Sequence, residues 1–340
     1  MEPVAALKRI AYLLERSAEP GFRVRAFRRA ADAVAAVAED DLRELSASGR
    51  LTTVPGVGSV TERVIAEALD GVRPVYLRRL EATAGRPVRE LGPELVAALR
   101  GDCHTHSDWS DGGEPIRVMA EAAIELGHEY IVLTDHSRGL TVANGLSEER
   151  LRRQLDVVAE LNREFAPFRI LTGIEVDILD DGTLDQDDEL LARLDVVVAS
   201  VHGKLRMERR AMTERMVAAM ANPHSDILGH CTGRLRTRRG RPESEFDADL
   251  VFAACARFDK AVEVNSRPER LDPPKRLLRL AVEAGCRVSI DSDAHSPGQL
   301  AWQPFGCERA AACGVAPESV VNTWTATDLL DWTATHGATS

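Results

Sequence analysis

The sequence predicts an α/β protein whose larger part is a slightly irregular parallel β/α barrel and whose first part is an all-α domain. From residue 101 onward, short apolar runs alternate with helical segments over about 240 residues, which is the pattern of a parallel barrel. Several of these runs stop at a residue that can bind a metal ion, so the strand ends would converge on one face. A chain of 340 residues with 44% hydrophobic content is long enough for both parts.

Seven strand-like runs and the helical segments between them define the expected barrel. The runs lie near 101–105, 130–135, 169–175, 195–201, 226–230, 261–265 and 287–292. The helical segments lie near 114–127, 147–165, 208–221, 245–258 and 273–285, with a shorter one near 187–193 and another after the last strand. No internal repeat interrupts this order, so the barrel is expected to occupy residues 101–340.

Residues 1–72 are expected to form a helical domain, followed by a short helical connector at 73–100. ALKRIAYLLERS and FRVRAFRRAADAVAAVAE have apolar residues at helical spacing, and the second segment begins with Arg23, Arg25, Arg28 and Arg29. LTTVPGVGSVTERVIAEAL then predicts a helix, a tight turn at Gly56 and Gly58, and a second helix. Such a hairpin offers backbone N–H groups to a nucleic-acid phosphate without reading bases. An ordinary helix-turn-helix with a glycine cap is the alternative.

Charge and cysteine content restrict the class of protein. Residues 1–100 contain 16 Arg and Lys against 14 Asp and Glu, and the remainder contains 27 against 40. An acidic main part suits a carboxylate-containing metal centre, and a slightly basic first part with arginine clusters suits contact with a polyanion. The six cysteines form no C-x-x-C pair, and neither a signal-type N-terminus nor a membrane span is evident. We therefore expect a cytoplasmic protein with reduced thiols.

The residues at the strand ends are of the types that bind metals. GDCHTH ends in His104 and His106, YIVLTDH in His136, ILTGIE in Glu175, DVVVASVH in His202, DILGH in His230, and VSIDSDAH contains Asp293 and His295. A structural zinc site would place its ligands in short C-x-x-C or H-x-x-x-H segments. Ligands delivered one or two per strand instead build a polynuclear catalytic centre. His128, His224 and His336 lie away from strand ends and are not expected to be ligands.

Several motifs in fixed order carry a resemblance to a known family. HTHSDWSDG, LTDHS, GIEVDI, SVHG, GHCTGR, EVNSRPERLDPP and IDSDAH resemble the PHP (polymerase and histidinol phosphatase) family. The first part is similar to the N-terminal helix-hairpin-helix domain of bacterial family X DNA polymerases, which carry a PHP domain at their C-terminus. In those polymerases the nucleotidyl-transferase domain lies between the two parts, and here about thirty residues leave no room for it. Lys8 is the only lysine before residue 204, so Schiff-base lyase chemistry is not expected.

The resemblance implies a PHP-type distorted barrel with three divalent metal ions, Zn, Mn or Fe, and nine ligands. His104, His106, Glu175 and Asp293 would hold the first ion, and Glu175 would bridge to a second held also by His202 and His230. Asp111, His136 and His295 would hold the third, although some relatives carry His at the position of Asp111. Glu175, Asp293 and His202 are the expected catalytic residues. Imidazole suits these metals, and a water between two bridged cations can lose a proton and attack phosphorus in line.

Arginines near the strand ends are candidates for binding the phosphate. They are Arg138 after TDHS, Arg234 in CTGR, and Arg267 and Arg270 in NSRPER. The guanidinium group offers a planar fork for phosphate, although each of these arginines could equally form a surface ion pair. The run Arg234, Arg236, Arg238, Arg239 and Arg241 follows a ligand-bearing strand end and should lie beside the metals, or else form a solvated loop. Asp177, Asp180, Asp181 and Asp185 lack the full EF-hand pattern, so we expect a turn that bends at Gly182.

Three functions remain open from the sequence. The first is a metal-dependent phosphodiesterase acting on DNA, a 3′–5′ exonuclease or 3′-end processing enzyme of repair, with sequence-independent DNA binding through the helical part. The second is a phosphomonoesterase of small metabolites that resembles histidinol phosphatase, because both reactions are attack at phosphorus. The third is a DNA-binding or scaffold protein whose metals are structural. Metal identity, strand preference and oligomeric state are not indicated by the sequence.

Overall fold

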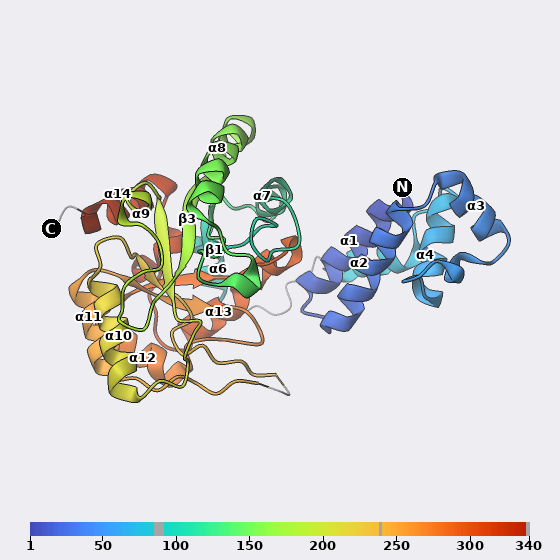
Figure 1. Ribbon diagram of the computed structural model, residues 1–340. Coiled ribbons are helices and arrows are strands. Elements are labelled where there is room, and N and C mark those ends of the chain that lie inside the picture. The colour runs from blue at the N-terminus through green and yellow to red at the C-terminus, as the bar shows by residue number, and fades with distance from the viewer. Residues whose placement is uncertain (85–91, 238–239, 338–340) are drawn as a thin grey trace. The chain divides into compact units, whose positions relative to one another are not determined.

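The computed structural model describes residues 1–84, 92–237 and 240–337 (Figure 1). Contacts between residues divide the chain into two compact units, Met1–Glu90 and Leu91–Ser340. The first unit is all-helical and the second contains the β-sheet. Among the described residues, no helix has the length and apolar character needed to cross a membrane.

Within residues 1–84, the first unit has five α-helices and one short 3₁₀ turn. They are α1 (Pro3–Arg16), α2 (Gly21–Ala35), α3 (Glu39–Ala47), the 3₁₀ turn Leu51–Thr53, α4 (Ser59–Leu69) and α5 (Val75–Ala84). The sequence pattern continued α2 to residue 39 and did not identify α3. The break occurs because Ala38 is extended, and the acidic residues Glu39, Asp40 and Asp41 then form the first turn of α3, where they favour a new helix N-terminus.

A single hydrophobic core holds the first unit together. Leu7, Ile10 and Leu14 of α1 are fully buried against Phe27 of α2 and Ile65 of α4. Leu77 of α5 is also fully buried in this core, so α5, which falls in the expected connector, packs within the first unit.

The predicted glycine turn precedes α4. Gly56 has φ +98°, and a side chain there would place its Cβ 3.3 Å from the carbonyl oxygen of Arg29. Only glycine adopts this backbone conformation readily at such a close approach. Gly58 is extended and caps α4, with its N–H donated to Thr61 Oγ1 at 2.9 Å. Ser59 and Val60, the first residues of α4, are exposed.

The second unit is built on seven parallel strands in sequential order, which confirms the predicted barrel. They are β1 (Gly101–Thr105), β2 (Tyr130–Leu133), β3 (Arg169–Asp177), β4 (Val196–Ser200), β5 (Ile227–Leu228), β6 (Ala261–Asn265) and β7 (Arg287–Asp291). Each strand pairs with the next. Their side chains are almost all buried on both faces, as expected for parallel strands covered by helices.

Side chains join the first and last strands. Asp291 accepts the Cys103 N–H at 2.8 Å, and Asp102 accepts the Ser292 N–H at 3.2 Å. Asn322 donates from Nδ2 to Asp291 Oδ1 at 2.8 Å and accepts the Ile290 N–H at 2.6 Å. One backbone bond, from His106 N–H to Ala294 O at 2.8 Å, lies at the carboxyl end of this seam. The barrel is therefore nearly closed, and the seam brings the ends of β1 and β7 together.

Helices surround the barrel. They are α6 (Pro93–Ala98), α7 (Ile116–Glu125), α8 (Glu148–Phe165), α9 (Asp188–Leu191), α10 (Arg209–Ala221), α11 (Ala248–Arg257), α12 (Lys275–Glu283), α13 (Gln303–Ala311) and α14 (Ala326–Gly337). Two α-helices, α13 and α14, follow the last strand where one was expected, because 3₁₀ turns at Pro317–Ser319 and Val321–Thr323 separate them. Helices α10, α11 and α12 lie side by side along one flank (Figure 1).

The six cysteines are free and buried. Cys103 of β1 lies in a hydrophobic cluster with Tyr130 and residues of the neighbouring strands, and Cys231 lies in the largest hydrophobic cluster. Burial raises the pKa of both thiols well above the usual value, so neither is a reactive thiolate at neutral pH.

Candidate metal centre

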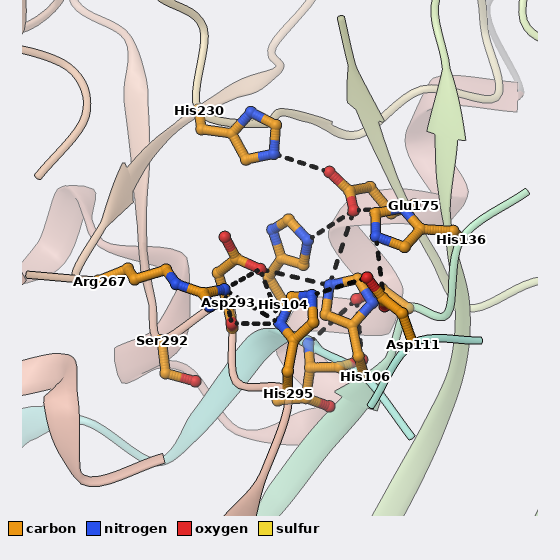
Figure 2. Close-up of polar contacts among 12 residues, drawn as sticks. His104, His106, Asp111, His136, Glu175, His230, Arg267, Ser292, Asp293 and His295 are labelled. Atoms are coloured by element: carbon orange, nitrogen blue, oxygen red, sulfur yellow. Dashed lines mark hydrogen bonds and ion pairs between the residues drawn. The ribbon is translucent and has the colours of Figure 1, made fainter. Parts of the chain in front are cut away.

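Glu175 lies at the centre of a group of imidazoles at the carboxyl end of the barrel (Figure 2). Its Oε1 is 2.8 Å from His230 Nε2 and 3.2 Å from His202 Nε2. Its Oε2 is 2.9 Å from His136 Nδ1, 3.3 Å from His104 Nε2 and 3.6 Å from His106 Nε2. One buried carboxylate thus faces five imidazoles that come from four other strand ends.

The strand ends deliver these side chains because all strands run in the same direction. His104 lies in β1, and His136 follows β2 and bridges to Glu175 of β3. His202 and His230 each follow the end of a strand by two residues. Residues separated by tens of positions therefore meet at one mouth of the barrel, as the strand-end pattern predicts.

A second group of ligand-type side chains surrounds Asp111 and Asp293. Asp111 lies 3.4 Å from His295 Nε2 and 3.5 Å from His136 Nε2. Asp293 Oδ1 lies 3.4 Å from His106 Nε2. Asp293 has φ +52°, a left-handed conformation that non-glycine residues adopt mainly at turns and functional sites.

Three sets of side chains bring their ligand atoms within 4.8 Å of one another. They are His106, Asp111, His136 and His295; His104, His106 and Glu175; and His136, Glu175 and His202. The first set contains the three residues expected at the third ion site with His106 added, and the second contains three of the four residues expected at the first ion site, without Asp293. In the last set His136 stands where His230 was expected, although His230 is itself in contact with Glu175.

The chemistry of these side chains fits bound cations. Buried imidazole nitrogens of His104, His106, His136 and His202 have no hydrogen bond of normal geometry within the described residues, and neither does Glu175 Oε2. Buried polar atoms without partners are costly in a folded protein. Imidazole and carboxylate groups that face one another in this way provide the donor set of Zn, Mn or Fe.

Burial and neighbouring charges shift the pKa values of the ligands in opposite directions. Burial favours neutral His104, but the carboxylates of Glu175 and Glu263 outweigh it and raise its pKa well above the usual value. For His202, burial is likewise outweighed by Glu175 and Asp177, which raise its pKa to about 9. Burial and the nearby imidazoles of His295 and His136 lower the pKa of His106 to about 3.

The two candidate carboxylate ligands are held in the charged form. Burial alone would raise the pKa of Glu175, but the charges of His104, His136 and His202 lower it well below its usual range. Burial opposes ionisation of Asp293 as well, and its contacts with His106 and Arg270 lower the pKa well below the usual value. Both carboxylates are therefore ready to bind cations at neutral pH.

Glu263 is a member of the site that the sequence pattern missed. Its Oε1 lies 2.7 Å from His104 Nδ1, and its other oxygen accepts the His230 N–H. Asp177 lies 3.5 Å from His202 Nδ1 in a similar position. Such carboxylates set the orientation and tautomer of a metal-binding imidazole. The signal in the sequence was an acidic residue inside the apolar strand AVEVN, two positions before Asn265.

The four candidate phosphate-binding arginines differ in their surroundings. Arg270 Nε lies 3.2 Å from Asp293 Oδ2, and Arg267 contacts His295 Nδ1 at 3.2 Å, so both lie in the site. Arg234 is bonded to the carbonyls of Arg270 and Leu271 and lies 3.2 Å from Glu243. Arg138 is half-exposed and pairs with Glu148 at 3.2 Å. In the expected arginine run, Arg238 and Arg239 lie outside the described residues.

The candidate DNA-binding arginines of α2 divide into two pairs. Arg23 bonds Glu19 and Tyr76, and Arg28 pairs with Glu15 at 2.6 Å. Arg25 and Arg29, one helical turn apart, are exposed and form no hydrogen bond or ion pair within residues 1–84. The backbone of Arg29 adjoins Gly56 of the hairpin, so the two free arginines lie on the helix that contacts the glycine turn.

The acidic residues after Glu175 form the expected turn. Ile178 and Leu184 pair as an antiparallel bridge, and Gly182 between them has φ +87°. Asp185 is buried and accepts N–H groups from Gly139 at 2.7 Å and from Asp177 at 2.9 Å. This carboxylate therefore fastens the loop that follows His136 to the end of β3.

A parallel barrel with a shared carboxylate and converging imidazoles at its mouth is an arrangement that suits a metal-dependent hydrolase. Family comparisons narrow this class: the PHP domain matches residues 102–267, and a helix-hairpin-helix domain matches residues 1–73. The chain therefore contains a PHP domain preceded by a helix-hairpin-helix domain, and it is a metal-dependent phosphoesterase.

The relatives fall into two groups. The chain is 42% identical over 246 residues to the "DNA polymerase/3'-5' exonuclease PolX" of Bacillus subtilis, which is 69% of this chain but only 43% of that protein. It is 27% identical over 231 residues to a protein of Syntrophotalea carbinolica named "Probable phosphatase", 65% of this chain and 90% of that protein. A solved histidinol phosphate phosphatase from Lactococcus lactis, complexed with zinc, L-histidinol and phosphate, aligns at 18% identity and a TM-score of 0.43, covering 63% of this chain and 92% of that one.

Proposed function

We propose that this protein is a phosphodiesterase acting on DNA, a 3′–5′ exonuclease or 3′-end processing enzyme. The observation that carries the proposal is the presence, in one chain, of a clustered imidazole and carboxylate centre and a helix-hairpin-helix unit. A small-molecule phosphatase has no evident use for a helix-hairpin-helix unit. The relative from Bacillus subtilis is named for a 3′–5′ exonuclease, which supports the same reading.

The proposed enzyme uses three divalent cations. His104, His106, Glu175 and Asp293 would hold one; Glu175, His202 and His230 a second; and Asp111, His136 and His295 a third. Bound cations lower the pKa of water and withdraw charge from phosphoryl oxygens, which is the chemistry that phosphate ester hydrolysis needs. Glu175, Asp293 and His202 would be the residues most directly involved, since each faces the centre of the cluster.

The remaining side chains of the mouth would bind and orient the substrate. Arg270 has two buried guanidinium nitrogens without a hydrogen bond in the described residues, and Arg267 is only partly buried. Both could donate to a phosphoryl oxygen while keeping their contacts with Asp293. Glu263 and Asp177 would keep the rings of His104 and His202 turned toward Glu175.

The helical unit would hold the DNA backbone. Arg25 and Arg29 are exposed and unpaired within the described part of this unit, and the first turn of α4 offers backbone N–H groups next to the Gly56 turn. These groups recognise phosphates and not bases, so we expect sequence-independent binding. The buried, free cysteines fit a cytoplasmic location.

A phosphomonoesterase of small metabolites is the second candidate. Relatives named as probable phosphatases match this chain over about 90% of their own length. The metal centre alone does not separate the two functions, because phosphomonoesters and phosphodiesters require the same cations and the same arginines.

The deciding experiment compares two substrates on one preparation. The protein loaded with Mn²⁺ or Zn²⁺ is assayed on 3′-labelled single-stranded and duplex DNA and on small phosphomonoesters, including histidinol phosphate. Metal-dependent release of nucleotides from the 3′ end supports the proposal, and an Arg25→Ala/Arg29→Ala variant should lose it selectively. Arg78→Ala/Arg79→Ala, which removes the same charge from exposed positions of α5, is the matched control. Turnover of phosphomonoesters without any DNA cleavage would establish the second candidate instead.

A further inference from the structure

A groove of about 690 Å³ lies between α10, α12 and the loop after β5. Its walls come from the loop after β5 and from the first turns of α10 and α12, which all lie at the carboxyl end of the strands. The groove is lined by Arg209, Arg234, Leu235, Arg236, Arg241, Pro242, Glu243, Ser244, Glu245, Phe246, Arg276 and Leu277.

Positive charge dominates this groove. Five arginines line it against two glutamates, although residues 101–340 as a whole carry 27 basic against 40 acidic side chains. Glu243 is shared between Arg234 and Arg276, and Arg209 pairs with Asp247 at 2.8 Å. An excess of one sign in a concave surface attracts ligands of the opposite sign.

Two of the arginines have no carboxylate partner. Arg236 is exposed, and in the described part of the chain its guanidinium forms no hydrogen bond or ion pair. Arg241 donates from Nε to the carbonyl of Gly233 at 2.6 Å and forms no ion pair within the described residues, with Asp272 as the nearest compensating charge. Leu235 and Arg241 form an antiparallel bridge, and the Arg236 N–H bonds the Glu269 carbonyl, so the backbone at both arginines is held in place.

Neighbouring arginines show the same excess of positive charge. Burial, together with the charges of Arg234 and Arg236, lowers the pKa of Arg309 to about 10. Burial lowers the pKa of Arg241, with the charge of Arg270 as the next cause. An anion in the groove would relieve this repulsion.

The groove and the metal centre share a wall. Arg234 donates to the carbonyl of Arg270 at 3.1 Å and also to that of Leu271. The side chain of Arg270 extends from this segment to Asp293 on the other side. A ligand bound at the metals could therefore continue directly into the groove.

We infer that the arginine groove binds a backbone phosphate of the DNA strand next to the scissile bond. The inference rests on the proposed function, since a small phosphomonoester has no second phosphate to place there. Arginine forks match phosphate oxygens, and Leu235, Phe246 and Leu277 supply apolar surface for the sugar. A groove of this size is ordinary for a ligand of nucleotide dimensions.

The test measures how much each added phosphate improves the substrate. The full-length protein is assayed on a deoxydinucleotide, which carries only the scissile phosphate, and on tri- and pentanucleotides. The variants are Arg236→Ala and Arg236→Glu. The controls are Arg257→Ala and Arg257→Glu, because Arg257 is an exposed arginine in the last turn of α11, at the end away from the barrel mouth.

For the wild type we expect kcat/KM to rise from the dinucleotide to the longer substrates. Arg236→Ala should reduce the pentanucleotide-to-dinucleotide ratio roughly tenfold, mainly through KM, and Arg236→Glu should reduce it further. The slope of log kcat/KM against log salt for the pentanucleotide should also fall by about 0.7 to 1. Because the helix-hairpin-helix unit is unchanged, its contribution is the same in all variants.

The outcomes separate the two proposals. If the wild type cleaves the oligonucleotides and the Arg236 variants have the same pentanucleotide-to-dinucleotide ratio of kcat/KM as the Arg257 controls, the groove does not bind the strand. The proposal of a DNA phosphodiesterase then still stands. If the wild type cleaves no oligonucleotide but hydrolyses small phosphomonoesters, both proposals are overturned.

Discussion

Replacing Glu263 by glutamine tests whether the buried carboxylate behind His104 tunes the metal centre. Glu263→Gln keeps the shape of the side chain and removes its charge. Glu263 is fully buried, and its Oε1 lies 2.7 Å from His104 Nδ1. A glutamine that turns its NH₂ group toward His104 would favour the wrong tautomer, in which Nε2 carries the proton and points at Glu175.

The expected size of the effect follows from this single contact. Loss of a carboxylate that orients a metal-binding histidine typically costs 10- to 100-fold in metal affinity or activity, or about 1.4 to 2.8 kcal/mol. Part of this loss of metal affinity is offset, because Glu263 is one of the carboxylates that raise the pKa of His104 in the metal-free protein and so favour a proton in place of the metal. Without it the imidazole releases its proton more easily. We therefore expect the loss of affinity to be larger at pH 8 to 9 than at pH 6.

The assay is competition for Zn²⁺ or Mn²⁺ against a chelating dye, combined with hydrolysis of a small phosphate ester at saturating metal. Glu283→Gln, which changes an exposed glutamate of α12, serves as the control. Thermal unfolding of the metal-free protein shows whether the variant still folds. A folded Glu263→Gln variant with the metal affinity and activity of the wild type would refute the assigned role.

Four further changes address other parts of the molecule. Glu175→Gln should remove bound metal, seen by elemental analysis, and lower phosphoesterase activity by about 100-fold or more; retention of full metal content would contradict the central role of this residue. Gly56→Val should weaken oligonucleotide binding about tenfold while small-ester hydrolysis is unchanged, because Val is strained at φ +98° beside Arg29 O. His336→Ala should lower the free energy of unfolding by about 2–4 kcal/mol, measured by denaturant titration, because buried Asp226 Oδ1 loses its contact with His336 Nδ1 at 2.6 Å. A loss of phosphoesterase activity per folded molecule would show that this pair is not purely structural. Burial lowers the pKa of Lys260 to about 8. The unfolded chain therefore binds more protons than the folded protein between pH 8 and 10.5, and the free energy of unfolding rises with pH across that window. The Lys260→Met variant should be more stable than the wild type by about 1–3 kcal/mol at pH 7 and equally stable at pH 10.5.

The sequence predicted the barrel and the convergence of the strand ends because both depend on periodicity. An apolar run that stops at His136 or His230 marks the carboxyl end of a parallel strand, and parallel topology alone brings such ends together. Glu263 escaped this reasoning because it lies inside a strand. A single acidic residue among apolar ones does not show whether its side chain points into the mouth or toward a covering helix.

Loops and helix boundaries were less predictable. Nothing in the arginine run indicates that Arg234 would turn toward the carbonyls of residues 270 and 271, because the direction of a loop side chain follows from contacts far away in the chain. Helix α3 was missed since the apolar pattern of α2 continues without interruption through Val37 and Ala38. An extended backbone at one alanine has no signature in composition or spacing.

The seam between the first and last strands has a consequence for when the enzyme can acquire its cations. His104 belongs to the first strand and Asp293 follows the last, and these strands meet only after nearly 190 intervening residues have taken their places. Such distant pairing makes assembly slow, and a chain still emerging from the ribosome cannot yet coordinate the first ion. Cation uptake would thus follow the pairing of the last strand with the first, and bound cations would stabilise only the closed barrel against unfolding.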